Sequence, residues 1–442
     1  MWHAVGVKSQ AVNLKTVRIG TVAAFVAVFG FMGYRGKSEA VRLAQRNLEA
    51  ARERALIEVE EVKAETAAAG HNNKAIVHAR NGEIEAAITE FSNAIEVRKQ
   101  QSQGKARREL ADTYKNRGIV LLRQRNHQRA LQDFAEAIEI LAKLVGDTGG
   151  SGDNAIELAS SLKRRSSALR DLGKSAEAIR DLETAIAILE PMLEQQWKDV
   201  AAELAALYTE RAALHRGQHE TSAADLERAI GIRTRLFQEH GQREVARNLA
   251  ENHNNLGIVL RGKGDLAQAL GEFDKAVQIR SKLLESPDAG GGDVVDLKNQ
   301  LAASYNNRAN VLLGQGNAAG ALADYEKSIE IRSQLMTVAK SSGLASSLAK
   351  TLSVAAWMYA TNMDPSVRDG QKAADLAKKA CEITEWKATV PLQALAAACA
   401  EVDDFPSAIK WQQQVIELAD EVEKESARAR LSEFQAGQPH RE

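Results

Sequence analysis

The chain has 442 residues and a formal net charge of −1, and only 6 of its residues are proline. This balanced charge lacks the basic footprint by which nucleic-acid-binding domains are recognised, so we expect no nucleic acid among its partners. Few prolines and aromatics, with abundant Ala, Leu, Glu, Lys and Arg, indicate an all-helical protein. Cys381 and Cys399 are too few for a disulfide framework or a four-ligand zinc site, and their apolar surroundings predict small buried core residues.

The first residues differ in composition from the rest of the chain. No acidic residue precedes Glu39, and a basic tail at residues 1–18 leads into an apolar stretch flanked by Arg18 and Arg35. Its sixteen apolar residues span about 24 Å as a helix, against a hydrocarbon core of about 30 Å. Local thinning of the bilayer, or arginines reaching to the interface, would close that gap. We therefore predict a single transmembrane anchor at residues 19–35.

Two questions about this anchor prediction stay open: whether the segment is cleaved, and on which side of the membrane the rest of the chain lies. A cleaved secretory signal has a similar layout, although the sequence Ser38-Glu39-Ala40 makes a poor cleavage site. Counting basic residues on each side of the anchor favours a cytoplasmic location for everything that follows. A short basic tail before an anchor is also how a signal anchor exports the downstream chain, so the side of the membrane is left open.

Residues 36–67 form a separate segment that is rich in Ala, Glu and Arg and has neither Gly nor Pro from residue 38 onward. Its apolar residues follow a loose three–four spacing that is broken at Glu58. This pattern predicts a helical stalk. The stalk is interpreted either as a coiled coil or as a solvated spacer.

From about residue 68 one pattern recurs, in which a small residue is followed four positions later by a large apolar residue and three positions after that by another small one. Successive copies are separated by 43, 48, 44, 47 and 52 residues. A turn glycine precedes most copies by five residues, and a further small residue precedes them by twelve. The six copies are Ala87/Phe91/Ala94, Ala130/Phe134/Ala137, Ala178/Leu182/Ala185, Ser222/Leu226/Ala229, Ala269/Phe273/Ala276 and Ala321/Tyr325/Ser328.

This pattern is the one that two closely packed antiparallel helices require. Small residues at the crossing let the helix axes approach, a large side chain fills the gap, and glycine ends the first helix. A single helical hairpin cannot bury its apolar stripe alone, so neighbouring hairpins stack and share a core. The predicted fold is therefore an all-α, right-handed α–α superhelix that follows the stalk.

At these positions the chain resembles the tetratricopeptide repeat (TPR) family, whose aromatic residue early in the first helix is matched by Tyr114, Tyr208 and Tyr305. The repeats are longer than the usual length of about 34 residues, as in kinesin-light-chain-like and bacterial signalling arrays. We predict about eight hairpins over residues 68–419, with a capping helix and tail at residues 420–442. The stretch from Ala355-Ala356-Trp357 through Arg430-Leu431 to Pro439-His440-Arg441-Glu442 resembles the C-terminus of TPR proteins of planctomycete-type bacteria, many of which carry a membrane span, and this resemblance implies the bacterial inner membrane.

No motif in the chain indicates catalysis. His215 and His219 stand four apart, but Gly217 places them in a turn and no Glu follows the first of them, which argues against a metal site. Glycine clusters at residues 149–152 and 290–292 lack the Lys-Ser/Thr of a phosphate-binding loop. We therefore expect neither an enzyme nor a metal or cofactor site.

One recurring polar position remains on the first helices, two residues before the further small residue that stands upstream of each copy of the pattern, such as Gly118 or Gly257. The resemblance implies that asparagines there hold the backbone of an extended peptide, because a carboxamide offers both a donor and an acceptor. Inter-repeat hydrogen bonding or simple exposure is the alternative reading. Lys115 and Arg164 are further candidates for pairing with an acidic ligand group. The position is occupied by Asn73, Asn116, Arg164, Glu210, Asn255 and Asn307.

These observations predict a membrane-anchored scaffold that binds an extended protein or peptide segment in the concave groove of its array. The alternative is a structural protein that self-assembles into a membrane-associated oligomer or coat.

Overall fold

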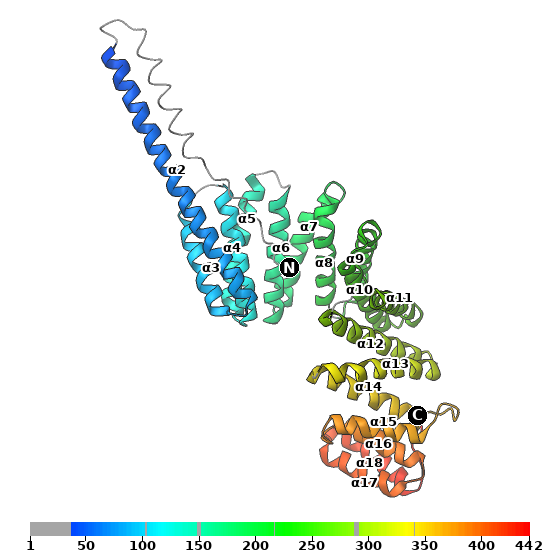
Figure 1. Cartoon of the computed structure of the whole chain (residues 1–442). Helices are drawn as coiled ribbons and strands as arrows, with labels where there is room; N and C mark the ends of the chain where they lie inside the picture. Colours follow the sequence, from blue (N-terminus) through cyan, green and yellow to red (C-terminus); the bar gives the residue numbers. More distant parts are fainter. Residues whose placement is uncertain (1–36, 102–103, 148–151, 216, 287–290, 340) are drawn as a thin grey trace. The chain divides into compact units, whose positions relative to one another are not determined.

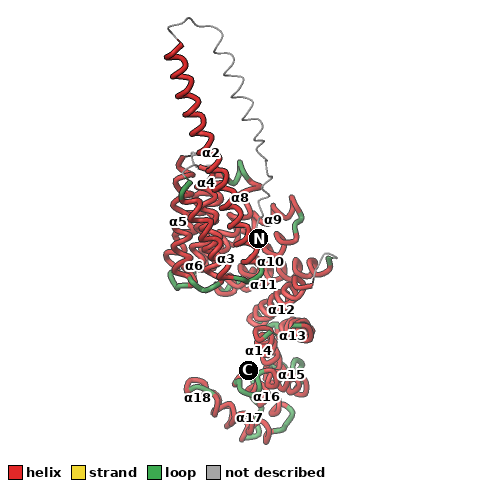
Figure 2. The backbone as a smooth tube through the Cα atoms, turned by 60° about the vertical axis from the view of Figure 1, so that its left-hand side comes forward, coloured by secondary structure: helices red, strands yellow, loops and turns green. Residues whose placement is uncertain are grey.

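The computed structural model describes residues 37–101, 104–147, 152–215, 217–286, 291–339 and 341–442 (Figure 1). These residues form α-helices joined by loops, with one short 3-10 turn and no strand (Figure 2). The prediction of an all-α helical-repeat fold is confirmed. The helices are α2 (Lys37–Arg80), α3 (Ile84–Lys99), α4 (Gly104–Arg123), α5 (His127–Asp147), α6 (Asp153–Asp171), α7 (Ser175–Leu189), α8 (Trp197–Leu214), α9 (His219–His240), α10 (Arg243–Lys263), α11 (Leu266–Glu285), α12 (Gly291–Gly314), α13 (Ala318–Val338), α14 (Ser342–Thr361), α15 (Gly370–Ile383), α16 (Thr389–Glu401), α17 (Phe405–Leu418) and α18 (Glu421–Gln435).

The chain divides into two compact units, Met1–Thr113 and Tyr114–Glu442. In the first unit, α2 is one continuous helix that runs through residue 67, where the stalk was expected to give way to the array. Gly70 does not interrupt it, because a glycine at an exposed helical position costs only about 1 kcal/mol. The later part of α2 packs against α3 through buried Ala75 and Ala79, whereas Leu43 and Leu56 in its earlier part are 61% and 67% exposed.

The second unit is a stack of helical hairpins. Each even-numbered helix from α4 to α16 is the first helix of a hairpin, and the odd-numbered helix after it is the second. First and second helices pack within each hairpin, and each second helix also packs against the first helix of the next hairpin. The first helices also adjoin one another directly, as α6 and α8 do, and likewise α14 and α16.

The recurring small–large–small residues lie in the core. Phe134 and Phe273 are fully buried, and each lies against a glycine of the preceding first helix. A Cβ added to Gly118 would lie 2.7 Å from a ring carbon of Phe134, and one added to Gly257 would lie 2.8 Å from a ring carbon of Phe273. These two glycines are therefore required by a close helix crossing.

The stack ends at α18. The carboxylate of Asp420 accepts from the backbone N–H of Glu423 at 2.9 Å and so caps this helix at its start. Gln412 of α17 donates to the Ala427 carbonyl at 2.9 Å, and Phe434 is buried. The helix thereby covers the otherwise open side of the last hairpin.

Among the helices of the described residues, none is long and apolar enough to cross a membrane. The predicted basic tail at residues 1–18 and the predicted anchor at residues 19–35 both lie outside the described residues.

Candidate partner-binding face

The first helices α4, α6, α8, α10, α12, α14 and α16 together form what we call the first-helix face. Two residues along an α-helix correspond to a rotation of about 200°. Because Gly118 and Gly257 lie against their own second helix, Asn116 and Asn255, two residues earlier, lie on the opposite side. We call this register the face position. In the second unit it holds Asn116, Arg164, Glu210, Asn255 and Asn307, and on α2 of the first unit it holds Asn73.

The face positions differ in what their side chains contact. Asn73 and Arg164 are exposed, while Asn116 and Asn255 are half-buried. Within the described part of the chain, no hydrogen bond engages the side chain of Asn116 or Asn255. The Asn307 side chain instead donates to Asn254 Oδ1 at 3.1 Å. Inter-repeat bonding therefore accounts for Asn307 and leaves the carboxamides of Asn116 and Asn255 available.

Glu210 is the one acidic residue among the face positions. Burial raises the pKa of this carboxyl above its usual 4.5, and the nearby cations Lys163, Arg170 and Arg164 offset part of the rise. Its Oε2 accepts from Ser167 Oγ at 3.4 Å. The centre of the first-helix face on α6 and α8 is thus a mixed-charge patch.

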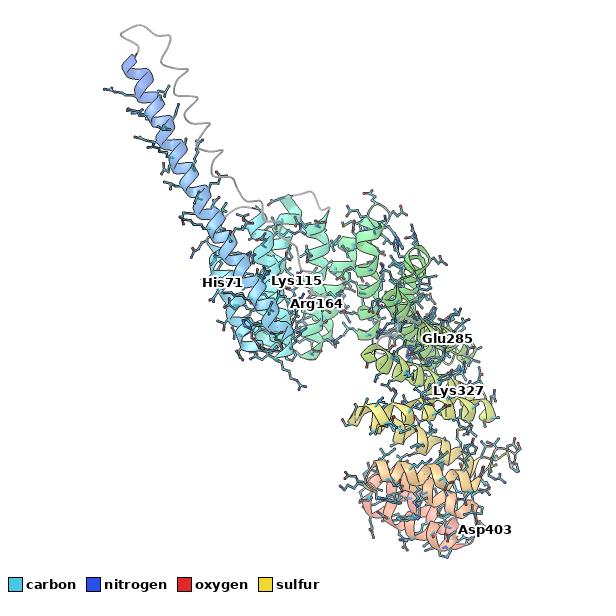
Figure 3. All side chains as sticks on the ribbon, in the orientation of Figure 1. His71, Lys115, Arg164, Glu285, Lys327 and Asp403 are labelled. Carbon is cyan, nitrogen blue, oxygen red and sulfur yellow. The ribbon has the colours of Figure 1, made fainter. Side chains whose placement is uncertain are left out.

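The residue directly before each face position serves a different purpose, and we call it the link position. Lys115 on α4 occupies it, and its ammonium pairs with Glu157 on α6. Figure 3 labels Lys115 and Arg164 on these two helices. Lys115 was predicted to pair with an acidic group of a ligand, but in the structure its acidic partner is Glu157 of the chain itself. The links are Lys115–Glu157, Lys163–Glu203, Thr209–Asn252, Asn254–Ser304 and Asn306–Thr351.

An acid–base clamp holds each of the first six hairpins together. The residue immediately before the large core residue is always acidic, and it bonds a base on the first helix. An Asp pairs with the Arg that directly follows the face position. A Glu pairs with a His that lies two residues before the face position. These Asp carboxylates, through bidentate hydrogen bonds, raise the pKa of Arg165 and Arg308. The clamps are His71–Glu90, Arg117–Asp133, Arg165–Asp181, Arg211–Asp225, His253–Glu272 and Arg308–Asp324.

These clamps were not predicted from the sequence, although the sequence contains a signal for them. An acid stands before the large residue in every copy of the pattern, at Glu90, Asp133, Asp181, Asp225, Glu272 and Asp324. Such regularity on a helix side that meets a neighbour indicates a buried partner, since solvated surfaces place no such demand on one position.

Buried arginines form a second recurring set. Seven residues after the large core residue stand Arg98, Arg233, Arg280 and Arg332, each of them buried. Arg233, Arg280 and Arg332 donate to hydroxyl, amide or carbonyl oxygens. Burial lowers the pKa of these three to about 10. In two hairpins the same register holds Leu141 and Leu189, both fully buried.

Reactive groups are scarce in the described residues. No cluster of His, Cys, Asp or Glu there could hold a metal ion. Both cysteines are free and buried, and burial raises the pKa of Cys381 to about 12 and of Cys399 to about 11. A thiol with so high a pKa is a poor nucleophile at neutral pH.

Family models agree with this arrangement of hairpins. A tetratricopeptide-repeat model matches residues 66–143, and a second one matches residues 254–288 and 301–336. The chain contains tetratricopeptide repeats. No curated protein matches the chain in sequence.

Several solved structures are similar to the chain. The C-terminal part of a TPR repeat-containing protein from Cytophaga hutchinsonii is 14% identical, with 72% of this chain and 96% of that one covered and a TM-score of 0.43. The apo form of the quorum sensor NprR from B. thuringiensis is 15% identical, with 86% and 95% covered and a TM-score of 0.46. A signal-transduction ATPase with a tetratricopeptide repeat sensor from Pyrococcus horikoshii is 13% identical, with 79% and 54% covered and a TM-score of 0.49.

Proposed function

We propose that this chain is a protein-interaction scaffold whose first-helix face holds an extended segment of a partner protein. One observation carries the proposal: the link positions are engaged within the chain, whereas the adjacent carboxamides of Asn116 and Asn255 are not. Asparagines that served only to join hairpins would be bonded as Asn307 is. A half-buried carboxamide without a protein partner is suited to a peptide group, to which it can both donate and accept.

Two apolar side chains on the first helices are also exposed. Ile258, one turn after Asn255, is 40% exposed, and Val354 on α14 is 37% exposed. Isolated exposed aliphatic residues are common on protein surfaces. Because Ile258 lies one turn from the unbonded carboxamide of Asn255, it favours a ligand whose backbone is held by asparagine and whose apolar side chains cover Ile258.

The proposal extends to the membrane. The apolar stretch between Arg18 and Arg35 supports a single-pass anchor at residues 19–35 in a bacterial inner membrane. Such an anchor would keep the scaffold and its bound partner at the membrane surface. Protease protection of the repeat array in intact spheroplasts distinguishes the two orientations.

The test of partner binding is capture from a native lysate by the chain carrying Asn116→Ala and Asn255→Ala. We expect the double variant to lose captured partners while its helical circular dichroism is unchanged. The matched control is Asn93→Ala with Gln278→Ala, two exposed carboxamides on the second helices α3 and α11. Equal capture by the native chain and the Asn116/Asn255 variant would exclude these positions as the binding site.

Self-assembly is the second candidate, and the exposed apolar residues of α2 favour it. Leu56 is 67% exposed and Val59 is 41% exposed on a helix whose earlier part has no packing partner in the described chain. Contiguous exposed apolar residues often mark an interface. A second copy of α2 is the simplest partner for such a helix.

Sedimentation of the full chain tests this second candidate. Self-assembly predicts an oligomer that Leu56→Glu with Val59→Glu dissociates. The control is Val338→Glu with Met363→Glu, which places charges at apolar residues that are 74% and 71% exposed elsewhere. A native chain that is monomeric at all concentrations rules out self-assembly and leaves the scaffold proposal untouched.

A further inference from the structure

The segment after α18 folds back onto an earlier hairpin. Glu442 donates its backbone N–H to the Thr361 carbonyl at 3.0 Å, and its side chain accepts from the Trp357 indole at 2.7 Å. Arg441 donates to the Ala360 carbonyl at 3.2 Å. Figures 1 and 2 both place the end of the chain beside α14. We call residues 436–442 the tail.

The atoms that receive the tail are matched to an Arg-Glu pair. Ala360 and Thr361 lie in the last turn of α14, where carbonyls lack helical partners and favour a cation. Glu401, at the end of α16, lies 2.6 Å from the Arg441 guanidinium. The Trp357 N–H meets the acidic side chain. The site therefore offers acceptors and an anion to the basic residue, and a donor to the acidic one.

Most of this site is held in place by residues outside the tail. Arg368 donates to Glu401 at 2.9 Å and to the Asn362 carbonyl at 2.8 Å, which fixes the carboxylate beside the end of α14. The Arg430 guanidinium of α18 lies 5.6 Å from the Trp357 ring. Because neither arginine belongs to the tail, the site keeps its shape when the tail leaves.

The tail itself is weakly held. It forms no helix and Gln438 is exposed, and its contacts on α14 are the hydrogen bonds of Arg441 and Glu442 and the His440 ring, whose centroid lies 5.5 Å from that of Trp357. The Arg441 and Glu401 side chains are 29% and 14% exposed, so solvent screens their pairing in part and its net free energy is modest. Ordering several residues opposes part of that gain. The tail is therefore a displaceable occupant.

We propose that the ends of α14 and α16 form a recognition site for an extended segment in which arginine is followed by glutamate. The tail occupies this site until a partner segment with the same pair displaces it. This proposal rests on the scaffold function, because α14 and α16 belong to the first-helix face and a bound segment can extend to their ends. To that function it adds the order of charges in the ligand, a basic residue followed by an acidic one.

A capped peptide with the sequence Gly-Gln-Pro-His-Arg-Glu is the probe, since capping leaves all charge on its side chains. Calorimetry compares the full-length native chain with a full-length variant carrying Arg441→Ala and Glu442→Ala, whose site is vacant. We expect a Kd at least about tenfold lower for the vacant variant, because a tethered tail competes at an effective concentration of the order of millimolar. Adding Glu401→Gln or Trp357→Phe to the vacant variant should weaken binding again by about tenfold.

The matched control is the same peptide with its last two residues exchanged, which preserves composition and net charge. Equal binding of the two peptides, or an equal Kd for the native chain and the vacant variant, would overturn the proposal. Circular dichroism verifies the fold of each variant. Asn116→Ala and Asn255→Ala added to the vacant variant should leave probe binding unchanged, so failure of this site is distinguishable from failure of the scaffold function.

Discussion

Two stretches of the second unit join their hairpins by different means. From α4 to α8 the first helices are linked by ion pairs, Lys115–Glu157 and Lys163–Glu203. Leu141 and Leu189 fill the register seven residues after the large core residue. From α9 to α14 that register holds buried arginines, and the links are made by hydroxyl and amide side chains. We call the two kinds leucine junctions and arginine junctions.

The difference shows that the same helix packing accepts either an apolar leucine or a charged arginine at this register. A leucine junction buries apolar surface and places its charges where they are partly solvated, so the loss of one partner is tolerable. An arginine junction buries a cation among neutral acceptors, and burial lowers the pKa of Arg332 to about 10. Removal of an acceptor there leaves a buried charged group with fewer partners, which is more costly. Arginine junctions should therefore depend strongly on single residues, and leucine junctions should not.

The largest effect is expected at Thr351, which accepts from Arg332 at 2.9 Å and from Asn306 at 2.7 Å. Thr351→Val keeps the shape of the side chain and removes only the hydroxyl. We expect a loss of about 3 kcal/mol in the free energy of unfolding, because a buried guanidinium loses an acceptor. Urea unfolding followed by circular dichroism measures it.

A second substitution tests whether Arg332 is the cause. Thr351→Val combined with Arg332→Leu converts this arginine junction into a leucine junction, and most of the lost stability should return. A double variant less stable than Thr351→Val alone would contradict the comparison.

The next effect should be the same in both stretches. Gly118→Ala would bring a Cβ to 2.7 Å from Phe134, and Gly257→Ala would bring one to 2.8 Å from Phe273. Overpacking should destabilise each variant by about 2 kcal/mol, and the higher helix propensity of alanine should offset part of this cost. We therefore expect each variant to lose about 1 to 2 kcal/mol in the free energy of unfolding. Urea unfolding of the two variants should give similar losses. If one glycine tolerates alanine and the other does not, the two stretches differ in their helix crossings as well as in their junctions.

The sequence predicted the fold class well, because helical repeats are encoded locally. The spacing of Ala130, Phe134 and Ala137 reflects one helix crossing, and the structure buries all three residues. The α2 boundary was not predictable in the same way. Helix-forming residues continue through residue 67, so packing against α3, rather than any residue on α2, determines where the first repeat begins.

The candidate site was predictable in register but not in its contacts. Spacing alone placed Asn116 and Asn307 at equivalent positions, yet only Asn307 bonds a neighbouring repeat. The partner of Lys115 is Glu157, 42 residues away on the next first helix. Pairs across junctions depend on loop length and helix rotation, which no local pattern encodes. The contact of the tail with Trp357 could not be predicted for the same reason.

A smaller effect is expected at the ion pair of a leucine junction. Lys163 lies 2.7 Å from Glu203, with side chains 11% and 21% exposed. Lys163→Met should cost about 1 kcal/mol in the free energy of unfolding, because the Glu203 side chain is still 21% exposed, although its Oε1 is buried. Raising the salt concentration from 0.1 to 1 M should reduce the difference between this variant and the native chain in urea unfolding. The exchanged pair, Lys163→Glu with Glu203→Lys, is the control and should recover part of the loss; a cost matching that of Thr351→Val would remove the distinction between the junctions.

The smallest effect concerns Glu210 on α8, between the two kinds of junction. Burial raises the pKa of this carboxyl above 4.5, so the folded chain binds its proton more tightly than the unfolded chain does. The stability contributed by the protonated form is complete below pH 4.5 and is lost as the pH rises through the folded-state pKa.

Glu210→Gln keeps the side chain neutral at every pH. Thermal unfolding should therefore give nearly equal Tm values for variant and native chain at pH 4, and a growing advantage for the variant toward pH 7. Glu183→Gln, at an exposed residue of α7, corrects for the change in net charge. A difference that is constant from pH 4 to pH 7 would mean that the Glu210 carboxyl has the same pKa in the folded and the unfolded chain. The cations Lys163 and Arg164 would then balance its burial, and at pH 7 the centre of the first-helix face would present an anion to its partner.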